Sequence, residues 1–338
     1  MHGRSRKGRK KVETKELRIG IVGTSMIAHK FADAARKSRL CTPIAVYSRG
    51  ASSGAAFAAA EGGLRVETDY RALLSMSELD AVYIASPNAL HYGQAMAALR
   101  AGKHVLCEKP TVSTLSEFRS LASEAERRGL VLMEAMRPLH DPALETIRSA
   151  IGRLGRLRRV DLEYCQYSSR YDRFLSGEVL NAFDPSLSNA AVMDIGVYPI
   201  ALLVALLGLP ESVRSESLFL HNGFEGAGNI SLDYGDKQVG VVYSKISDSV
   251  NPSVIEGERG SLTIDKISAP TRVTLHPRGE SPVTLPLSSI GNNMLYEVEA
   301  FAAMVRGESG AEPYLNISLE TLAVVEKAYS QTGAAEKM

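Results

Sequence analysis

The chain has 338 residues, of which 45 % are hydrophobic and 23 % charged, with three cysteines and a formal net charge of +1. These proportions are average for globular proteins, so they exclude a disordered chain and a membrane-embedded bundle, and the length predicts about two or three domains. Six Lys and Arg residues crowd the first eleven positions; the remainder has 33 basic and 38 acidic residues, which excludes the basic surface of a nucleic-acid-binding domain.

Residues 1–16 are predicted to form a basic, disordered tail. A short run of Lys and Arg without aromatic residues is more typical of a solvated extension than of a nucleic-acid-binding patch, which is the alternative. No apolar segment follows the run, so we expect neither a secretory nor a twin-arginine signal, and we expect a cytoplasmic protein. Cys41, Cys107 and Cys165 are widely spaced and odd in number, which agrees with reduced thiols.

Residues 17–137 are predicted to form a Rossmann domain, an α/β fold with a doubly wound parallel sheet. Short apolar runs alternate with segments of helical periodicity, and the predicted strands cover residues 17–22, 42–47, 64–66, 80–86, 104–110 and 131–135. Strands that are apolar throughout are buried on both faces, as in a parallel sheet covered by helices on both sides.

Residues 138–330 are predicted to form an α+β domain. In RRVDLEYCQY, residues 158–167, apolar and polar residues alternate, which indicates a strand with one covered face. Further strands joined by short Gly-Asp and Gly-Glu turns favour antiparallel hairpins. The apolar stretch Val197–Leu209 is shorter than the roughly 20 residues that a bilayer span needs, so it predicts a buried helix and no membrane partner. Two closing helices are expected from Tyr296 and from Leu319.

The stretch GIVGTSMIA, residues 20–28, has most of a dinucleotide-binding fingerprint. Gly23 permits the tight turn from strand to helix, and Ala28 is small enough for the helix to pack on the strand. Ser25 stands where the second glycine normally lets the backbone approach the pyrophosphate, but its hydroxyl can donate to an anion at the helix N-terminus. A purely structural turn is the alternative for this loop.

The end of the next strand bears on the choice of cofactor. An acidic residue there would bind the ribose 2′-hydroxyl of NAD(H), whereas an arginine accommodates the 2′-phosphate of NADP(H). Ser48 and Arg49 occupy this position and no acid is near. We therefore expect NADP(H) to be preferred, with NAD(H) as the second choice, and an exposed turn arginine as the structural alternative.

Four motifs together resemble the glucose-fructose oxidoreductase, inositol dehydrogenase and rhizopine-catabolism family, written Gfo/Idh/MocA. They are the glycine loop, the segment Ser86-Pro87-Asn88 with His91, the segment Glu108-Lys109-Pro110, and the segment Asp194-Ile195-Gly196-Val197-Tyr198. Their order and spacing are those of the family, and the resemblance extends from about residue 17 to the closing helices. CQYSSRYD and SNAAVMDIGVY further resemble a bacterial branch in which a serine in the glycine loop is usual.

The resemblance implies a fold and an activity. It implies a C-terminal domain with an open, mainly antiparallel sheet that binds substrate and joins subunits into a homodimer or homotetramer. Family members transfer hydride between NAD or NADP and a secondary alcohol carbon. We therefore expect a dehydrogenase or reductase that acts on CH–OH groups of a small sugar-like or polyol substrate. The alternatives are an NAD-dependent redox-assisted glycosidase and a non-enzymatic regulator that senses cofactor and sugar; such regulators tend to lose the catalytic lysine, and Lys109 is present.

Lys109, Asp194 and Tyr198 are the expected catalytic residues. Hydride transfer needs a group that takes or gives the hydroxyl proton, and Lys109 fits if desolvation or a neighbouring cation lowers its pKa. In the family the bond between Lys109 and Pro110 is typically cis. Asp194 and Tyr198 are four residues apart, so on a helix they share a face, and the resemblance places that face opposite Lys109. A helix N-cap is the structural alternative for Asp194.

The remaining candidates are binding residues. The expected cofactor contacts are Gly23, Thr24, Ser25, Met26, Ile27, Ser48, Arg49, Ser86, Pro87, Asn88, His91, Glu108, Lys109 and Arg137. The expected substrate contacts are Lys109, Arg170, Tyr171, Asp194 and Tyr198. A packing role is the alternative for His91, and exposed loop charge is the alternative for Arg170. The seven histidines are scattered without a ligand-like pair, so we expect no metal.

Overall fold

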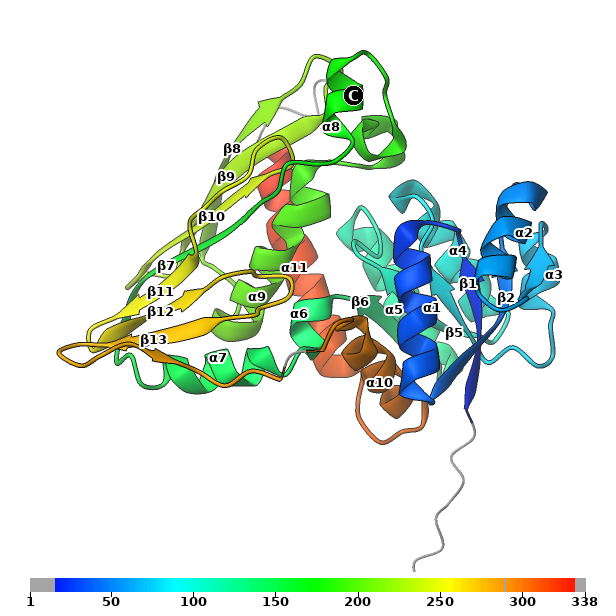
Figure 1. Ribbon diagram of the computed structural model, residues 1–338, viewed down its shortest axis with the longest axis horizontal. Coiled ribbons are helices and arrows are strands. Elements are labelled where there is room, and N and C mark those ends of the chain that lie inside the picture. The colour runs from blue at the N-terminus through cyan, green and yellow to red at the C-terminus, as the bar shows by residue number, and fades with distance from the viewer. Residues whose placement is uncertain (1–15, 289, 332–338) are drawn as a thin grey trace, which may run out of the picture.

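The computed structural model describes residues 16–288 and 290–331, so the predicted tail lies outside the described residues apart from residue 16. Two sheets lie side by side and are joined by helices between them (Figure 1). The first sheet has six parallel strands in the order β3-β2-β1-β4-β5-β6. Its strands are β1 (Leu17–Val22), β2 (Cys41–Tyr47), β3 (Arg65–Glu67), β4 (Ala81–Ile84), β5 (His104–Glu108) and β6 (Leu132–Ala135).

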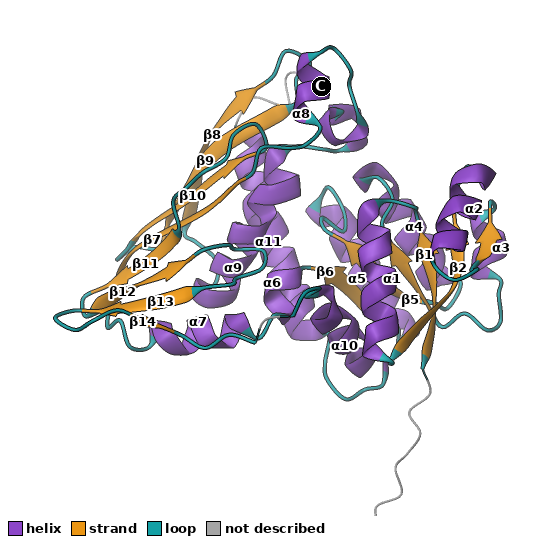
Figure 2. Ribbon diagram, in the orientation of Figure 1, coloured by secondary structure: helices purple, strands orange, loops and turns teal. Residues whose placement is uncertain are grey.

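Helices cover both faces of this sheet (Figure 2), as the wholly apolar strands predicted. They are α1 (Met26–Ser38), α2 (Ala51–Ala60), α3 (Tyr70–Leu74), α4 (Asn88–Arg100) and α5 (Leu115–Arg128). All four residues of β4 are buried, and a separate apolar core lies on each face of the sheet. The helix ends follow local chemistry, since α5 begins with a capping box of Thr114 and Glu117 and ends at Gly129 in the left-handed conformation. The predicted doubly wound fold is confirmed.

The second sheet has eight strands in the order β14-β13-β12-β11-β7-β10-β9-β8. They are β7 (Leu157–Cys165), β8 (Ser212–Phe219), β9 (Glu225–Asp233), β10 (Gln238–Ser244), β11 (Ser253–Gly257), β12 (Gly260–Ile264), β13 (Val273–Pro277) and β14 (Val283–Thr284). Every pair is antiparallel except β7 and β10, which run parallel. The mainly antiparallel sheet is therefore confirmed. The sequence did not predict β11, β13 or β14, because two to five residues carry too little periodicity to identify a strand.

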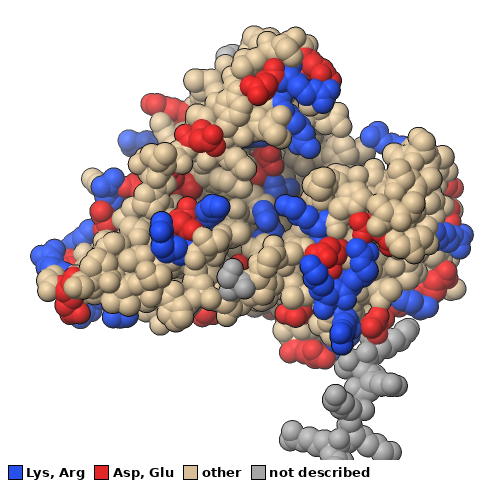
Figure 3. All heavy atoms as spheres, viewed as in Figure 1, with Lys and Arg blue, Asp and Glu red and all other residues tan. Residues whose placement is uncertain are grey.

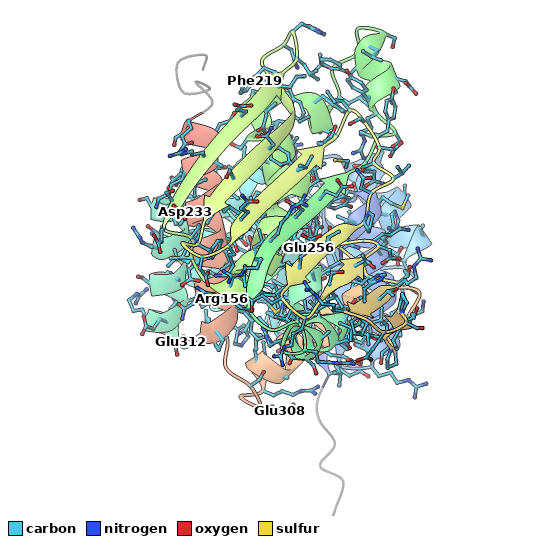
Figure 4. The ribbon with its side chains drawn as sticks, turned by 90° about the vertical axis from the view of Figure 1, so that its left-hand side faces the viewer. Arg156, Phe219, Asp233, Glu256, Glu308 and Glu312 are labelled. Carbon is cyan, nitrogen blue, oxygen red and sulfur yellow. The ribbon has the colours of Figure 1, made fainter. Side chains whose placement is uncertain are left out.

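Helices cover only one face of the second sheet. They include α7 (Ala143–Ile151), α9 (Val197–Leu207) and α11 (Glu312–Ser330), which contribute to one large apolar core with the strands. Among residues 16–288 and 290–331, no helix lies on the opposite face (Figure 4). Among the described residues, Pro185–Leu207 is long and apolar enough to cross a membrane, but 78 % of its apolar window is buried inside the structure, as in the core helix of a globular domain. The buried helix expected here is therefore present.

Two helices tie the second half of the chain back to the first sheet. The helix α10 (Met294–Val305) packs on α1, and α11 packs on both α5 and α9. The short helix α6 (Arg137–His140) contacts α9 and α10. The closing helices expected from the sequence thus lie between the two sheets (Figure 1). The domain boundary at residues 137 and 138 stays a prediction.

Candidate active site

Gly23 shapes the turn between β1 and α1. Its φ is 109°, and a Cβ at this position would lie 2.7 Å from the main-chain oxygen of Ala85. Its N–H donates to the carbonyl of Tyr47 at 3.0 Å. A larger residue would be strained and would also collide with the end of the neighbouring strand segment. The loop therefore needs glycine here, and it lies where β1, β2 and β4 end.

The N-terminus of α1 is open to an anion. Ser25 is the N-cap residue but its side chain makes no capping hydrogen bond, and the first turn contains no acidic residue. Met26 is 69 % exposed, while Thr24 and Ile27 are partly buried. The first N–H groups of a helix lack intrahelical partners and carry partial positive charge, so this end fits a diphosphate. The loop and helix thus have the shape and polarity that a dinucleotide requires.

Ser48 and Arg49 differ in how they are placed. Ser48 is buried, and its hydroxyl is 2.8 Å from the hydroxyl of Ser53. Arg49 is exposed, and no ion pair of its guanidinium is found among residues 16–288 and 290–331. The guanidinium of Arg49 is therefore accessible, whereas the hydroxyl of Ser48 is held within the protein.

The segment Ser86-Pro87-Asn88 opens α4 after β4, and its polar groups bond within the protein. The Ser86 hydroxyl donates to Gln94 Oε1 at 2.6 Å, and Pro87 is the N-cap residue of α4. The Asn88 amide donates to the carbonyl of Ser188 at 3.2 Å and to Asn189 Oδ1 at 3.0 Å. Both amide hydrogens thus join the first sheet to the segment before α9, and this use was not expected for a predicted cofactor contact.

His91 is 1 % exposed, and its ring spans two strand ends. Nδ1 lies 2.9 Å from the carbonyl of Pro110, and Nε2 lies 2.8 Å from the carbonyl of Ser86. Burial lowers the pKa of His91, while the two carbonyls raise it. The geometry supports the packing alternative for this residue, because no ring atom is left for a cofactor.

Lys109, directly after β5 of the first sheet, meets Asp194 and Tyr198, which lie just before and in α9. Its Nζ donates to Asp194 Oδ1 at 2.8 Å and to the main-chain oxygen of Asp194 at 2.6 Å, and lies 5.1 Å from the centre of the Tyr198 ring. The Lys109 side chain is 10 % exposed and the Asp194 side chain 39 %. The bond between Lys109 and Pro110 is cis, as the family resemblance implied. Figure 3 shows the hollow between the two parts of the molecule, with basic side chains at its edges.

Arg137 is a second cation beside Tyr198. Its Nη2 donates to the Tyr198 hydroxyl at 3.4 Å, and its Cζ lies 5.6 Å from the ring centre. Lys109 lies near the same ring, so the phenol has two positive charges close to it. The structure therefore places Arg137, an expected cofactor contact, beside Tyr198.

The turn that carries Asp194 is a π-helix, Val192–Gly196, rather than the α-helix that the sequence predicted. Gly196 allows it to pack closely on the second sheet, since a Cβ there would lie 3.1 Å from the Tyr243 ring. Single π turns are frequent at functional sites. Asp194 and Tyr198 both contact Lys109, as expected. The expectation that Asp194 lies in an α-helix was wrong.

The charge state of Lys109 is set by two opposing effects. Burial lowers its pKa, but the nearby Asp194 carboxylate and Tyr198 raise it by more, so the net shift is upward from the ordinary value. Burial raises the pKa of Asp194, but Lys109 and Lys245 lower it by more. Desolvation does lower the Lys109 pKa, but the Asp194 anion beside it outweighs this effect. Lys109 is an ammonium and Asp194 a carboxylate.

Burial raises the pKa of Tyr198, against the lowering effect of Lys109 and Arg137. Tyr198 therefore holds its proton at neutral pH. With Lys109 also protonated, both groups carry a proton that they could donate.

Sequence reasoning missed Lys245 and Glu297. Lys245 follows β10, and its Nζ lies 2.7 Å from Asp194 Oδ2. Glu297 in α10 is 1 % exposed, and its Oε1 has no hydrogen-bond partner among the described residues. Burial and the nearby Glu108 raise the pKa of Glu297 well above its usual value. An acid on the apolar face of YEVEAF was a usable signal for Glu297, whereas a lysine at a strand end gave none for Lys245.

Glu108 is placed behind the site. Its Oε1 accepts a hydrogen bond from the Tyr83 hydroxyl at 2.5 Å. Burial raises its pKa, and the Tyr83 hydrogen bond and the charges of Lys109 and Arg137 lower it by less. The carboxyl of Glu108, an expected cofactor contact, therefore bonds within the protein. The sequence did not predict that it lies near Glu297.

Arg170 and Tyr171 are not brought to this cluster. Arg170 is exposed at the start of α8 (Tyr171–Leu175), and Tyr171 stacks on Phe174 and Phe183. No contact of either with Lys109, Asp194 or Tyr198 is found in the described ranges. As for metals, no group of three His, Cys, Asp or Glu side chains in the described part of the chain is arranged to hold an ion.

The fold and this cluster define an oxidoreductase with a nucleotide-binding Rossmann unit. Residues 17–136 match the oxidoreductase family with the NAD-binding Rossmann fold, and residues 145–263 match the GFO/IDH/MocA C-terminal domain. The chain belongs to the GFO/IDH/MocA family of NAD(P)-dependent oxidoreductases.

Similar proteins are known from several organisms. The chain is 39 % identical over 319 residues to scyllo-inositol 2-dehydrogenase (NADP(+)) IolU of Bacillus subtilis, covering 94 % of this chain and 97 % of that protein. It is also 39 % identical over 317 residues to the uncharacterized oxidoreductase YgjR of Escherichia coli, with the same coverage. The crystal structure of KijD10, a 3-ketoreductase from Actinomadura kijaniata in complex with NADP and TDP-benzene, superposes with a TM-score of 0.85 at 24 % identity over 94 % of this chain and 98 % of that chain. At this identity the last comparison shows the fold alone.

Proposed function

We propose that the chain is an NADP(H)-dependent oxidoreductase that transfers hydride between nicotinamide and a secondary alcohol or carbonyl carbon of a cyclic polyol or sugar. The proposal rests on the contacts of Lys109, which directly follows β5. Its Nζ lies 2.8 Å from Asp194 Oδ1 and 5.1 Å from the centre of the Tyr198 ring. Ligands of doubly wound folds bind at the carboxyl ends of the strands, where the glycine loop also lies. One cofactor can therefore span from the loop to the lysine.

The proposal for NADP(H) rests on Arg49 and on the relatives. Arg49 is exposed, unlike the buried Ser48 next to it. IolU and D-xylose 1-dehydrogenase (NADP(+)) 2 of Haloferax volcanii, 39 % and 27 % identical to the chain, both have NADP(+) in their names. An arginine at this position accommodates the 2′-phosphate. The bound nicotinamide would supply or accept the hydride.

The chain's own residues would manage the proton. In carbonyl reduction the carbon gains a hydride, and its oxygen becomes an alkoxide that takes one proton from Lys109 or Tyr198. Both groups carry that proton at neutral pH, as their raised pKa values show. Asp194 faces the cleft with 39 % of its side chain exposed, so it can accept a hydrogen bond from a substrate hydroxyl and orient the ring. Alcohol oxidation reverses these transfers and needs one donor to lose its proton first.

The substrate class is inferred from the named relative, and a spectrophotometric assay tests it. Purified full-length protein would be mixed with NADP+ or NAD+ and inositol isomers, aldoses or other polyols, and with NADPH and the corresponding ketones, at 340 nm. We expect turnover with at least one inositol isomer or aldose, and a higher kcat/KM with the phosphorylated cofactor. Absence of hydride transfer with every compound, or a preference for NAD(H), would contradict the respective part of the proposal.

We also propose that the chain forms a homodimer or homotetramer through the uncovered face of the second sheet (Figure 4). Leu218 in β8 is 53 % exposed and Val242 in β10 is 45 % exposed. Large apolar side chains on an uncovered sheet face favour contact with another surface. Sedimentation velocity of the full-length protein is expected to show a dimer or tetramer, and a monomer across the micromolar range would refute the interface.

A further inference from the structure

Lys245 holds the carboxylate of Asp194 from the side opposite Lys109. Its Nζ lies 2.7 Å from Oδ2, while Lys109 Nζ lies 2.8 Å from Oδ1. The Lys245 side chain is only 6 % exposed. Each oxygen of one carboxylate is therefore paired with a different buried ammonium.

The ammonium of Lys245 is engaged by groups of the protein. Besides Asp194, it donates to the carbonyl of Ala182 at 2.9 Å. Its Nζ lies 5.1 Å from the centre of the Phe183 ring and 5.2 Å from the centre of the Phe224 ring. Two of the three hydrogens of the ammonium are thus engaged by Asp194 and Ala182, and two aromatic rings lie beside it. Lys245 can therefore influence the reaction through Asp194, through the segment that contains Ala182, and through its charge near Lys109.

That segment, residues 181–189, touches both sides of the cleft. At one end the carbonyl of Ala182 is bound by Lys245, and at the other end Ser188 and Asn189 are bound by Asn88 of α4. The Asn189 amide also donates to the carbonyl of Asn181 at 2.6 Å, which closes the segment on itself. Lys245 thus connects Asp194 to a loop that spans from the second sheet to the first.

We propose that Lys245 is a positioning residue of the active site, which fixes the Asp194 carboxylate against Lys109 and sets the place of residues 181–189. The inference rests on the proposed function, because its kinetic meaning depends on Asp194 and Lys109 acting on a substrate. It also has an electrostatic consequence: two ammonium groups share one carboxylate, so Asp194 neutralises only part of the charge on Lys109. The charge of Lys245 thereby favours release of the Lys109 proton to a nascent alkoxide.

Lys245→Met tests this role in the full-length protein, with Lys237→Met as the matched control. Lys237 directly precedes β10 and Lys245 directly follows it, but Lys237 pairs with Asp236, away from the cleft. We expect Lys245→Met to lower kcat about tenfold and to move the pH at which alcohol oxidation accelerates to a higher value, because Lys109 loses a repelling neighbour. Lys245→Arg is expected to keep most of the natural kcat and pH dependence. Lys237→Met is expected to change neither kcat nor the pH dependence. A Lys245→Met variant with the kcat and pH profile of the control would overturn the proposal.

A second measurement does not require turnover. Asp194→Asn leaves Lys109 and Lys245 as two buried ammonium groups without an anion, so it should lower Tm. Lys245→Met removes one of these two ammonium groups. The change in Tm that it causes should therefore be more favourable, by a few degrees, in the Asp194→Asn background than in the natural chain. Lys237→Met should have the same effect in both. Equal effects of Lys245→Met in the two backgrounds would refute the pairing. If the protein turned over no substrate but this difference were found, the pairing would stand and the proposed function would fall.

Discussion

The two ends of the cleft are built in opposite ways. At the cofactor end, Ser25 makes no side-chain capping bond, Met26 is 69 % exposed and Arg49 is exposed, all within 25 residues of Ser25. At the catalytic end, Lys109 and Asp194 are 85 positions apart in the chain and their charges are already paired. The cofactor end thus exposes main-chain groups and unpaired side chains, whereas the charged side chains at the other end are already paired with one another.

This difference predicts how each end responds to substitution. Removing an exposed side chain leaves no buried partner without a contact, so the substitution is expected to affect ligand affinity and not the stability of the protein. Removing one member of a buried ion pair leaves an uncompensated charge, which affects chemistry and stability together. The experiments below compare the two ends on this basis.

Lys109→Met should produce the largest effect, at the catalytic end. Loss of the proton donor and of the charge facing a nascent alkoxide is expected to lower kcat about 10³-fold or more. Because Arg49 and the glycine loop are untouched, the Kd for NADPH measured by fluorescence titration should stay within about twofold. Lys37→Met, which removes an exposed lysine with a 62 % exposed side chain, is the control. Retained turnover in Lys109→Met would remove Lys109 from the mechanism.

The pH dependence should separate the two reaction directions. The pKa of Lys109 is raised, so the protonated form persists through neutral and moderately alkaline pH. Carbonyl reduction uses that form and should be nearly constant between about pH 6 and pH 9, whereas alcohol oxidation needs the neutral amine and should rise up to about tenfold per pH unit. Initial rates at saturating substrate measure both. An oxidation rate that levels off below about pH 7 would show that another group accepts the proton.

Arg49→Ala should produce a smaller and purely cofactor-specific effect. A lost charge-assisted hydrogen bond to a 2′-phosphate corresponds to about tenfold or more in affinity. We expect the Kd for NADPH to rise by that factor and the Kd for NADH to stay unchanged, with kcat at saturating cofactor nearly intact. Arg71→Ala, an exposed arginine in α3, is the control. Equal weakening of both cofactors would argue against the 2′-phosphate contact.

Ser25→Ala should have the smallest effect. The helix N-terminus and its N–H groups remain when the hydroxyl is removed, so the Kd for NADPH should rise by no more than about threefold. The same titration compares it with Ser53→Ala, whose hydroxyl contacts Ser48 and not the loop. A loss of more than about tenfold in Ser25→Ala would mean that the serine hydroxyl, rather than the backbone, binds the pyrophosphate.

Much of this architecture was predictable because its signals are local. Apolar runs such as AVYI and the spacing of Gly23 and Ala28 depend on neighbouring residues, and these features identified the parallel sheet and the loop correctly. The motifs that contain Lys109, Asp194 and Tyr198 likewise identified three side chains that the structure brings together. The short strands of the second sheet were missed, since their order depends on pairing with strands elsewhere in the chain.

The sequence by itself thus determined the fold class, the glycine loop and the identity of the central lysine. Only the tertiary structure decided the charge state of that lysine, because the Asp194 carboxylate is brought within 2.8 Å from 85 positions away and outweighs the effect of burial. The same holds for Lys245, Glu297 and the π-helix around Asp194, whose surroundings come from several distant elements. Electrostatic effects depend on distance in space and on exclusion of water, and neither is written in the order of residues along the chain.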